Sequence, residues 1–231
     1  MKKVVIGITE CSKYENYANW IAKENDVEIL QLSYKENNLS ALEKCNAIVL
    51  TGGEDINPLL YHKPDYQKFC EDKIDKRDAF EWKVLEYSQK NQIPLLGICR
   101  GLQIGNAFFG GTLIPDLITW GKEKHSKVKG YDLYHQVTVK PGSLLHEITK
   151  SESGEVNSAH HQSADQVADG LMITATSSDG VIEGLERKNR NGKSFLLFVQ
   201  WHPERMKDQE SNFASGIRKE FIRQVRDSIS S

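Results

Sequence analysis

The feature of the sequence that most directly indicates chemistry is a cysteine between two glycines, in Gly97-Ile98-Cys99-Arg100-Gly101. It follows an apolar run of strand length and precedes a stretch with helical spacing. This layout is typical of a nucleophile elbow, a sharp strand-to-helix turn in which the central residue is strained and larger neighbours would collide. The exposed N–H groups and the dipole of the helix then favour a thiolate. The pattern predicts that Cys99 is a nucleophile; the alternative is a small apolar residue at a strand end.

A histidine and a glutamate follow a second strongly apolar run, residues 195–200, in the segment Trp201-His202-Pro203-Glu204. Proline favours an extended conformation for the residue before it, which would put Glu204 on the same side as the imidazole. A nucleophilic cysteine requires a base and a group that orients the base. We therefore expect His202 to be the base and Glu204 its partner. Without Cys99, a solvent-facing polar cluster would be the simpler interpretation.

Two glycines end another apolar run, residues 47–50, and open the segment Gly52-Gly53-Glu54. A backbone N–H group can approach a substrate carbonyl closely where no Cβ intervenes, and the residue after a nucleophile commonly donates a second one. Gly53 and Arg100 are therefore the expected oxyanion donors. Open α/β sheets bind ligands at the carboxyl ends of their strands, where all these segments are expected to lie.

The other histidines are weaker candidates. His160 and His161 are rivals for the base, but adjacent residues of a strand face opposite ways and neither has a carboxylate two residues away. The remaining four are expected to be ordinary surface residues: His62, His125, His135 and His146. A zinc site made by His125, His135 and the His160 pair lacks supporting spacing of the H-E-x-x-H kind. No metal or other cofactor is therefore expected.

Apolar runs of strand length alternate with amphipathic stretches of helix length along most of the chain, which predicts an α/β fold. Expected strands are residues 4–9, 27–32, 47–50, 93–98, 171–176, 181–186 and 194–200, and expected helices are 14–24, 39–44, 75–89, 102–109 and 212–228. Between residues 114 and 158 the pattern weakens, and hairpins or a flap are expected. The fold class is therefore a three-layer structure with a mostly parallel central sheet, helices on both faces and a small antiparallel region. A single domain over residues 1–231 is the simplest division.

The composition excludes several classes of protein. Thirty basic residues against 32 acidic ones give a net charge of −2, so nothing recommends nucleic acid as a partner. No apolar stretch approaches the roughly 20 residues of a membrane helix. The remaining cysteines, Cys11, Cys45 and Cys70, form no C-x-x-C pair and are assigned no chemistry. A cytoplasmic protein with reduced thiols is expected.

These motifs resemble those of the class I glutamine amidotransferase-like superfamily and, within it, the gamma-glutamyl-gamma-aminobutyrate hydrolase family. The superfamily is indicated by GICRG at residues 97–101 and WHPE at residues 201–204. The hydrolase branch is indicated by NSAHHQ at residues 157–162, DGVIE at residues 179–183, and Arg77-Asp78 followed by Glu81. TGGEDINP at residues 51–58 and GGTL at residues 110–113 also match. Residues 120–153 match little and are where substrate preference is expected to be set.

The resemblance implies a flavodoxin-like fold, a Cys99–His202–Glu204 triad, and oxyanion donors at Gly53 and Arg100. It also implies contacts between the glutamate half of the substrate and Gln103, His161 and Gln162. The expected reaction is hydrolysis of a γ-glutamyl amide through a thioester, releasing glutamate and an amine.

Two other functions stay open: a glutaminase subunit that feeds ammonia to a separate synthase, and a catalytically silent binding protein. The expected partner is the small-molecule amide, with no nucleic acid and no membrane. A homodimer is compatible with the sequence, and a synthase partner is not favoured.

Overall fold

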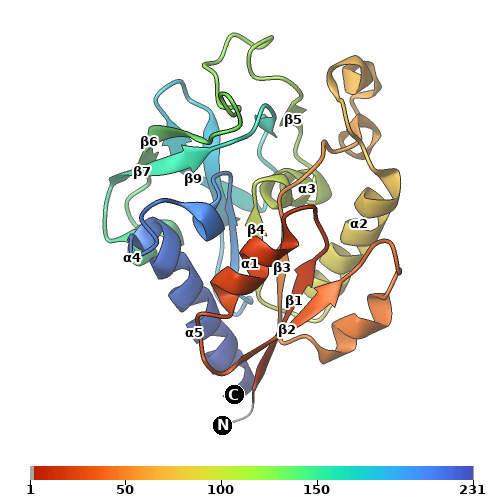
Figure 1. The fold of residues 1–231 in the computed structure, drawn as a ribbon, viewed down its shortest axis with the longest axis vertical. Coiled ribbons are helices and arrows are strands. Elements are labelled where there is room, and N and C mark those ends of the chain that lie inside the picture. The colour runs from red at the N-terminus through yellow and green to blue at the C-terminus, as the bar shows by residue number, and fades with distance from the viewer. Residues whose placement is uncertain (1–2, 231) are drawn as a thin grey trace.

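A twisted sheet runs through the centre of the computed structural model, which describes residues 3–230 (Figure 1). The ends of the expected domain, residues 1 and 231, lie outside this range. Within the described residues the sheet has nine strands in the order β2-β1-β3-β4-β11-β10-β9-β6-β7. No helix in this part of the chain has the length and apolarity needed to cross a membrane.

The first half of the sheet is parallel and consists of β1 (Val4–Thr9), β2 (Val27–Leu32), β3 (Ala47–Leu50), β4 (Leu95–Ile98) and β11 (Leu196–Val199). Every residue of β3, β4 and β11 is buried. Helices cover both faces, so these strands have uninterrupted apolar sequences. The strands agree with the sequence prediction except at the ends of two. β4 begins at Leu95, after Pro94, which has no N–H to give to a neighbouring strand, and β11 spans Leu196–Val199 within the expected residues 194–200.

The second half of the sheet is antiparallel and consists of β10 (Ile182–Arg187), β9 (Leu171–Ser177), β6 (Leu133–Val139) and β7 (Ser153–Ser158). The expected hairpin is thus β6 and β7, which extend the main sheet rather than cover it. A short helix, α4 (Leu144–Thr149), connects them, and the Ser143 side chain caps it by accepting from the N–H of His146. A separate small antiparallel sheet pairs β5 (Leu113–Ile114) with β8 (Ser163–Ala164).

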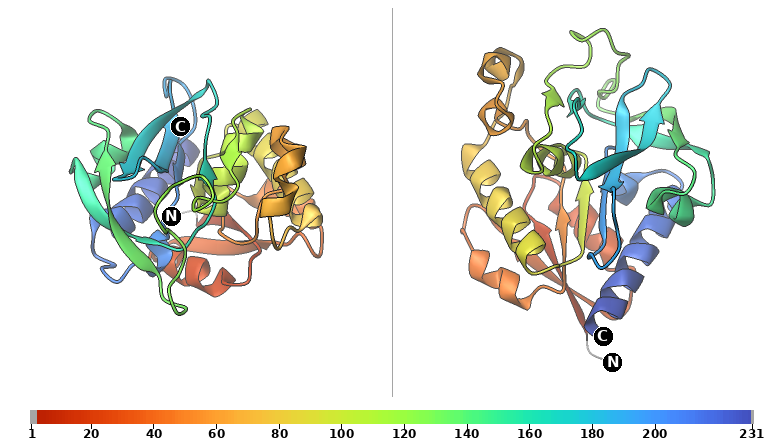
Figure 2. Two further views of the ribbon diagram at one scale, coloured as in Figure 1. Left: turned by 90° about the horizontal axis from the view of Figure 1, so that it is seen from above. Right: turned by 180° about the vertical axis from the view of Figure 1, so that it is seen from behind.

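Helices cover both faces, as predicted (Figures 1 and 2). Helices α1 (Tyr14–Ile21) and α5 (Ile217–Ser230) pack on one face, in a core that includes Val49 of β3. Helices α2 (Asp75–Lys90) and α3 (Arg100–Phe108) pack on the other, against Ile48 and Leu50. Successive residues of β3 thus enter opposite cores, as the pleat of a strand requires. The short helix expected at residues 39–44 is the 3₁₀ helix η1 (Leu39–Lys44).

Candidate active site

Cys99 stands between β4 and α3 with a backbone φ of 54° and is 6% exposed. The two flanking glycines are required by close backbone contacts. A Cβ on Gly97 would lie 2.8 Å from the carbonyl of Gly101, and a Cβ on Gly101 would lie 2.6 Å from the carbonyl oxygen of Leu50. The predicted elbow is therefore present, with the strained conformation at the cysteine itself.

His202 and Glu204 lie beside Cys99, because β11 is the parallel neighbour of β4 and both strands end at the same edge. The Nδ1 atom of His202 is 2.9 Å from Oε1 of Glu204, and both side chains are buried. The expectation that this segment stays extended is wrong beyond His202. A 3₁₀ turn, η4 (Pro203–Arg205), folds the carboxylate back onto the imidazole.

The surroundings of His202 favour its protonated form. Burial alone would lower the pKa of the imidazole, but the charges of Glu204 and of the Cys99 thiolate outweigh it and raise the pKa to about 9. Near neutral pH the imidazole of His202 therefore holds a proton next to the sulfur of Cys99.

Tyr17 is a neighbour of this pair that sequence reasoning missed. Its hydroxyl is 3.3 Å from Nδ1 of His202 and accepts from the N–H of Gly52 at 2.9 Å. It lies in α1, where its spacing with Trp20 and Ile21 indicates only a core position. No signal in the sequence separates a tyrosine whose ring fills the core from one whose hydroxyl reaches the site.

Asn157 is a second missed residue. Its Oδ1 accepts from the backbone N–H of His202 at 3.0 Å, and its amide donates to Asp132 at 3.0 Å. Asp132 also accepts from Arg205 at 2.8 Å. These contacts fasten the end of β7 to the segment that carries the histidine. The motif NSAHHQ contains Asn157, but its contact with His202 appears only in the folded chain.

The backbone at Gly53 borders the same pocket. Gly53 has a φ of 153°, and a Cβ there would lie 2.0 Å from Nη1 of Arg77, so only glycine fits. The N–H of Gly52 is already used, because it donates to the hydroxyl of Tyr17. The N–H of Gly53 is therefore the candidate oxyanion donor in this segment. Arg100 begins α3, whose first N–H groups have no intrahelical acceptor. The side chain of Arg100 is buried and turns away from the pocket.

A buried ionic network supports the elbow from beneath. Arg100 pairs with Asp78 and Glu81 of α2, and Glu81 also accepts from Nε of Arg77 at 2.9 Å. Arg77 in turn donates to the carbonyl oxygen of Gly52 at 3.0 Å and pairs with Glu54 at 2.6 Å. The i, i+4 spacing of Arg77 and Glu81 is typical of an intrahelical ion pair, and this pair forms. The structure adds the links to the elbow and to the Gly52 segment.

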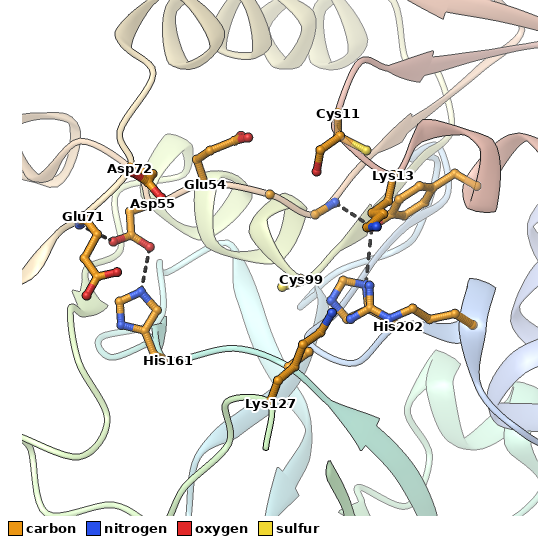
Figure 3. A pocket seen from close by; sticks show the side chains of 16 residues that line it. Cys11, Lys13, Glu54, Asp55, Glu71, Asp72, Cys99, Lys127, His161 and His202 are labelled. Atoms are coloured by element: carbon orange, nitrogen blue, oxygen red, sulfur yellow. Dashed lines mark hydrogen bonds and ion pairs between the residues drawn. The ribbon is translucent and has the colours of Figure 1, made fainter. Parts of the chain in front are cut away.

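The carboxyl ends of β1, β3, β4 and β11 meet at a pocket of about 350 Å³ (Figure 3). Its lining divides by charge. The carboxylates Asp55, Glu71 and Asp72 lie on one side together with His161, and Lys127 extends toward Cys99 and His202 from another. The pocket is therefore suited to a small polar molecule that carries charges of both signs.

The three residues expected to bind substrate have different positions. His161 lines the pocket, with Nε2 2.8 Å from Oδ1 of Asp55, and this contact raises the pKa of the imidazole. Gln103 is buried and donates to the carbonyl oxygen of Gln162 at 3.0 Å. Gln162 donates to the carbonyl oxygen of Pro115 at 3.2 Å. Neither glutamine side chain is among the groups that line the pocket.

The expectation that His125 is a surface residue is wrong. It is 3% exposed, and it lies with His135 and His160 around the buried carboxylate of Glu183. His125, His135 and Glu183 present ligand atoms within 4.8 Å of one another and could hold a metal ion. Sequence spacing argued against a zinc site made by His125, His135 and the His160 pair, because the members come from separate segments that only the fold brings together around Glu183.

Comparison with known proteins gives the class of this chain. Residues 4–204 match the Peptidase C26 family. The chain is 34% identical to the protein NtpR of Enterococcus hirae over 76% of this chain and 74% of that protein. It is 30% identical to the gamma-glutamyl-gamma-aminobutyrate hydrolase PuuD of Escherichia coli K12, over 88% of this chain and 87% of that protein. A glutamine amidotransferase structure from Thermotoga maritima superposes with a TM-score of 0.69 at 16% identity, covering 97% of this chain and 99% of that one.

The chain therefore belongs to the Peptidase C26 family, within the class I glutamine amidotransferase-like proteins. It is a hydrolase that acts on amide bonds. The resemblance inferred from the motifs is confirmed, and so is the expected fold class.

Proposed function

We propose that the protein hydrolyses a γ-glutamyl amide at its C–N bond through a thioester on Cys99. The observation that carries this proposal is the strained, glycine-flanked Cys99 next to an imidazole whose Nδ1 is held 2.9 Å from Glu204. A nucleophile, a base and an orienting carboxylate are the three groups that acyl transfer to cysteine needs.

In the first half of the reaction, the Cys99 thiolate attacks the γ-carbonyl carbon and a C–S bond forms. The N–H groups of Gly53 and Arg100 are the proposed donors to the resulting oxyanion. His202, as an imidazolium, gives its proton to the leaving nitrogen, and the C–N bond breaks. In the second half, neutral His202 takes a proton from water, the hydroxide attacks the thioester, and the C–S bond breaks to release glutamate.

The charges around the pocket support a substrate with a glutamyl half. The α-amino group of that half suits the carboxylates of Asp55, Glu71 and Asp72. His161, which lies next to Asp55, is placed to contact the same glutamyl half. Gln103 and Gln162 act in this proposal by shaping the wall behind it. Lys127 is suited to bind a carboxylate on the leaving amine. γ-Aminobutyrate, which appears in the name of the Escherichia coli relative, carries such a carboxylate.

A glutaminase subunit for a separate synthase is the second candidate. The glutaminase domain of CTPS from Trypanosoma brucei shares the fold, with a TM-score of 0.67 at 16% identity. We favour the stand-alone hydrolase because the hydrolase relative is 30% identical over 88% of this chain.

All four cysteines are unpaired, which supports our proposal of a reducing, cytoplasmic location.

The test is a kinetic comparison of three amides: γ-glutamyl-γ-aminobutyrate, γ-glutamyl-butylamine and free glutamine. The proposal expects the first to have the highest kcat/KM, because only its leaving amine carries a carboxylate. Cys99→Ala is expected to abolish turnover. A diazo-ketone analogue of glutamine should add once to the wild-type chain, as measured by intact mass, and not to Cys99→Ala.

Cys45→Ala is the matched control, since Cys45 is buried away from the pocket and should leave both rate and labelling unchanged. A preference for free glutamine that depends on an added synthase would support the glutaminase candidate instead. Turnover by Cys99→Ala at the wild-type rate would refute the mechanism. A folded chain that is neither labelled nor active would indicate the silent binding protein.

A further inference from the structure

We propose that His125, His135, His160 and Glu183 form a structural site for one zinc ion in the antiparallel half of the protein. This site is separate from Cys99 and His202. It also departs from the expectation, based on sequence spacing, that the chain binds no metal.

Four segments distant in the sequence bring the ligands together. His125 lies in the loop before β6, His135 lies in β6, His160 follows β7, and Glu183 lies in β10. Glu183 has no exposed surface, while His125 and His160 are 3% and 4% exposed. Three imidazoles enclosing one buried carboxylate are a donor set suited to zinc.

The distances around the carboxylate fit a small cation. Oε1 of Glu183 is 3.4 Å from Nδ1 of His125, 3.3 Å from Nε2 of His135 and 3.4 Å from Nε2 of His160. Tetrahedral zinc with bonds of about 2.0–2.1 Å places neighbouring ligand atoms about 3.3–3.4 Å apart. His125, His135 and Glu183 present ligand atoms within 4.8 Å of one another, and Nε2 of His160 lies 3.4 Å from the same carboxylate oxygen of Glu183.

The second contact of each ring indicates where its proton is. Nδ1 of His160 donates to the carbonyl oxygen of Gln162 at 2.9 Å, so Nε2 of the neutral ring carries a lone pair toward Glu183. Nε2 of His125 is 3.3 Å from both carboxylate oxygens of Asp179, so this nitrogen carries a proton, and Nδ1 faces Glu183. Carbonyl and carboxylate partners of this kind orient histidine ligands in metal sites.

Hydrogen bonds do not satisfy this centre. Five buried polar atoms of the cluster have no hydrogen-bond partner among residues 3–230: Nδ1 of His125, Nε2 of His135, Nε2 of His160 and both carboxylate oxygens of Glu183. Leaving buried polar groups unpaired is costly. One zinc ion between these atoms would satisfy the converging nitrogens and the carboxylate together.

The site would order one wall of the active-site pocket. Lys127 lies two residues after His125, and Ala159 and His161 flank His160; all three line the pocket. A bound ion would therefore join the segment that carries Lys127 to β10 without contacting the reacting atoms.

The experiment measures zinc retained by the full-length chain after gel filtration, together with a titration against a chromophoric chelator. We expect about one zinc ion per chain. Glu183→Gln and His135→Ala should bind at least roughly tenfold more weakly, because loss of even an outer partner costs tenfold or more. His135 is the most exposed ligand, at 18%, and is the variant best placed to fold.

His62→Ala, which removes an exposed histidine outside the cluster, should bind zinc as the wild type does. The measurements are made in Cys99→Ala, so that Cys99 and His202 cannot supply a competing site. Cobalt should give the visible bands of a tetrahedral site without sulfur-to-metal charge transfer. No retained zinc, equal affinity in both cluster variants, or a sulfur charge-transfer band would overturn the proposal.

Discussion

Which steps the site can carry out depends on the protonation state of His202. The leaving nitrogen must receive a proton before the C–N bond breaks, and the imidazole beside Cys99 is a group that can give one. Glu204 and the Cys99 thiolate raise its pKa to about 9 against the effect of burial, so it holds that proton across the neutral range. The same imidazole accepts a proton only after it has given this one away.

We therefore expect kcat/KM to fall at alkaline pH with an apparent pKa of about 9, as His202 loses its proton. Glu204→Gln removes the neighbouring negative charge and should move this alkaline limb to lower pH by roughly one unit or more. The measurement is a pH–rate profile of γ-glutamyl amide hydrolysis between pH 6 and pH 10.

Glu86→Gln, on the exposed side of α2, is the control and should leave the profile unchanged. An alkaline limb that stays in place in Glu204→Gln would contradict the role given to that carboxylate.

Because the pKa of His202 is raised above its usual 6.5, its ion pairs stabilise the fold fully below pH 6.5. That contribution is lost as the pH rises through about 9.

The sequence predicts those residues of the site that stand in an unusual local sequence context. Cys99 stands out by its flanking glycines, and His202 and Glu204 by their place after an apolar strand. Tyr17 and Asn157 contact the same histidine through a hydroxyl and an amide that common helix and strand residues also carry. Their part in the site depends on tertiary position and not on local pattern.

The helices α2 and α3 are joined by charge as well as by apolar packing. Glu81 accepts from Arg77 and Arg100 at once, and all three side chains are buried. Ions removed from water stabilise a fold only when each retains its partners. The network therefore fixes the start of α3, and with it the position of Cys99.

Glu81→Gln should lower the free energy of unfolding by about 3–5 kcal/mol, because it leaves two buried guanidinium groups short of a partner. Glu147→Gln is the matched control, since it breaks an exposed ion pair with Arg190 and should cost about 1 kcal/mol or less. Both values are measured by urea unfolding. Equal losses in the two variants would show that the buried network does not stabilise the elbow.

The elements that the sequence predicts well have a strong apolar pattern of their own. β1, β3 and α2 lie where periodicity puts them, within a residue at each end. For β7 (Ser153–Ser158) only a hairpin or flap somewhere in residues 114–158 was predictable, because the sequence SGEVNS has little strand propensity and pairing with β6 imposes its conformation. α4 escaped prediction because its six residues are too few to show helical periodicity.

The two halves of the sheet contribute different parts of the site. The parallel half ends in Cys99, His202 and the Gly52 segment, all on short turns directly after buried strands. The antiparallel half and its connections supply Lys127 and His161 to the lining of the pocket. The histidine cluster lies within this second half, so a metal bound there would stabilise the substrate-facing wall and not the catalytic turns.

Zinc is accordingly expected to raise the stability of the whole protein. At a free concentration 100 times its Kd, a ligand that binds only the folded state adds about 2.7 kcal/mol. For a chain of 231 residues this corresponds to an increase in Tm of about 5–10 °C, measured by calorimetry in Cys99→Ala. Glu183→Gln should show no such increase, and His62→Ala should show all of it. Hydrogen exchange should slow at residues 120–135 on zinc addition, and unchanged exchange there with a raised Tm would locate the ion elsewhere.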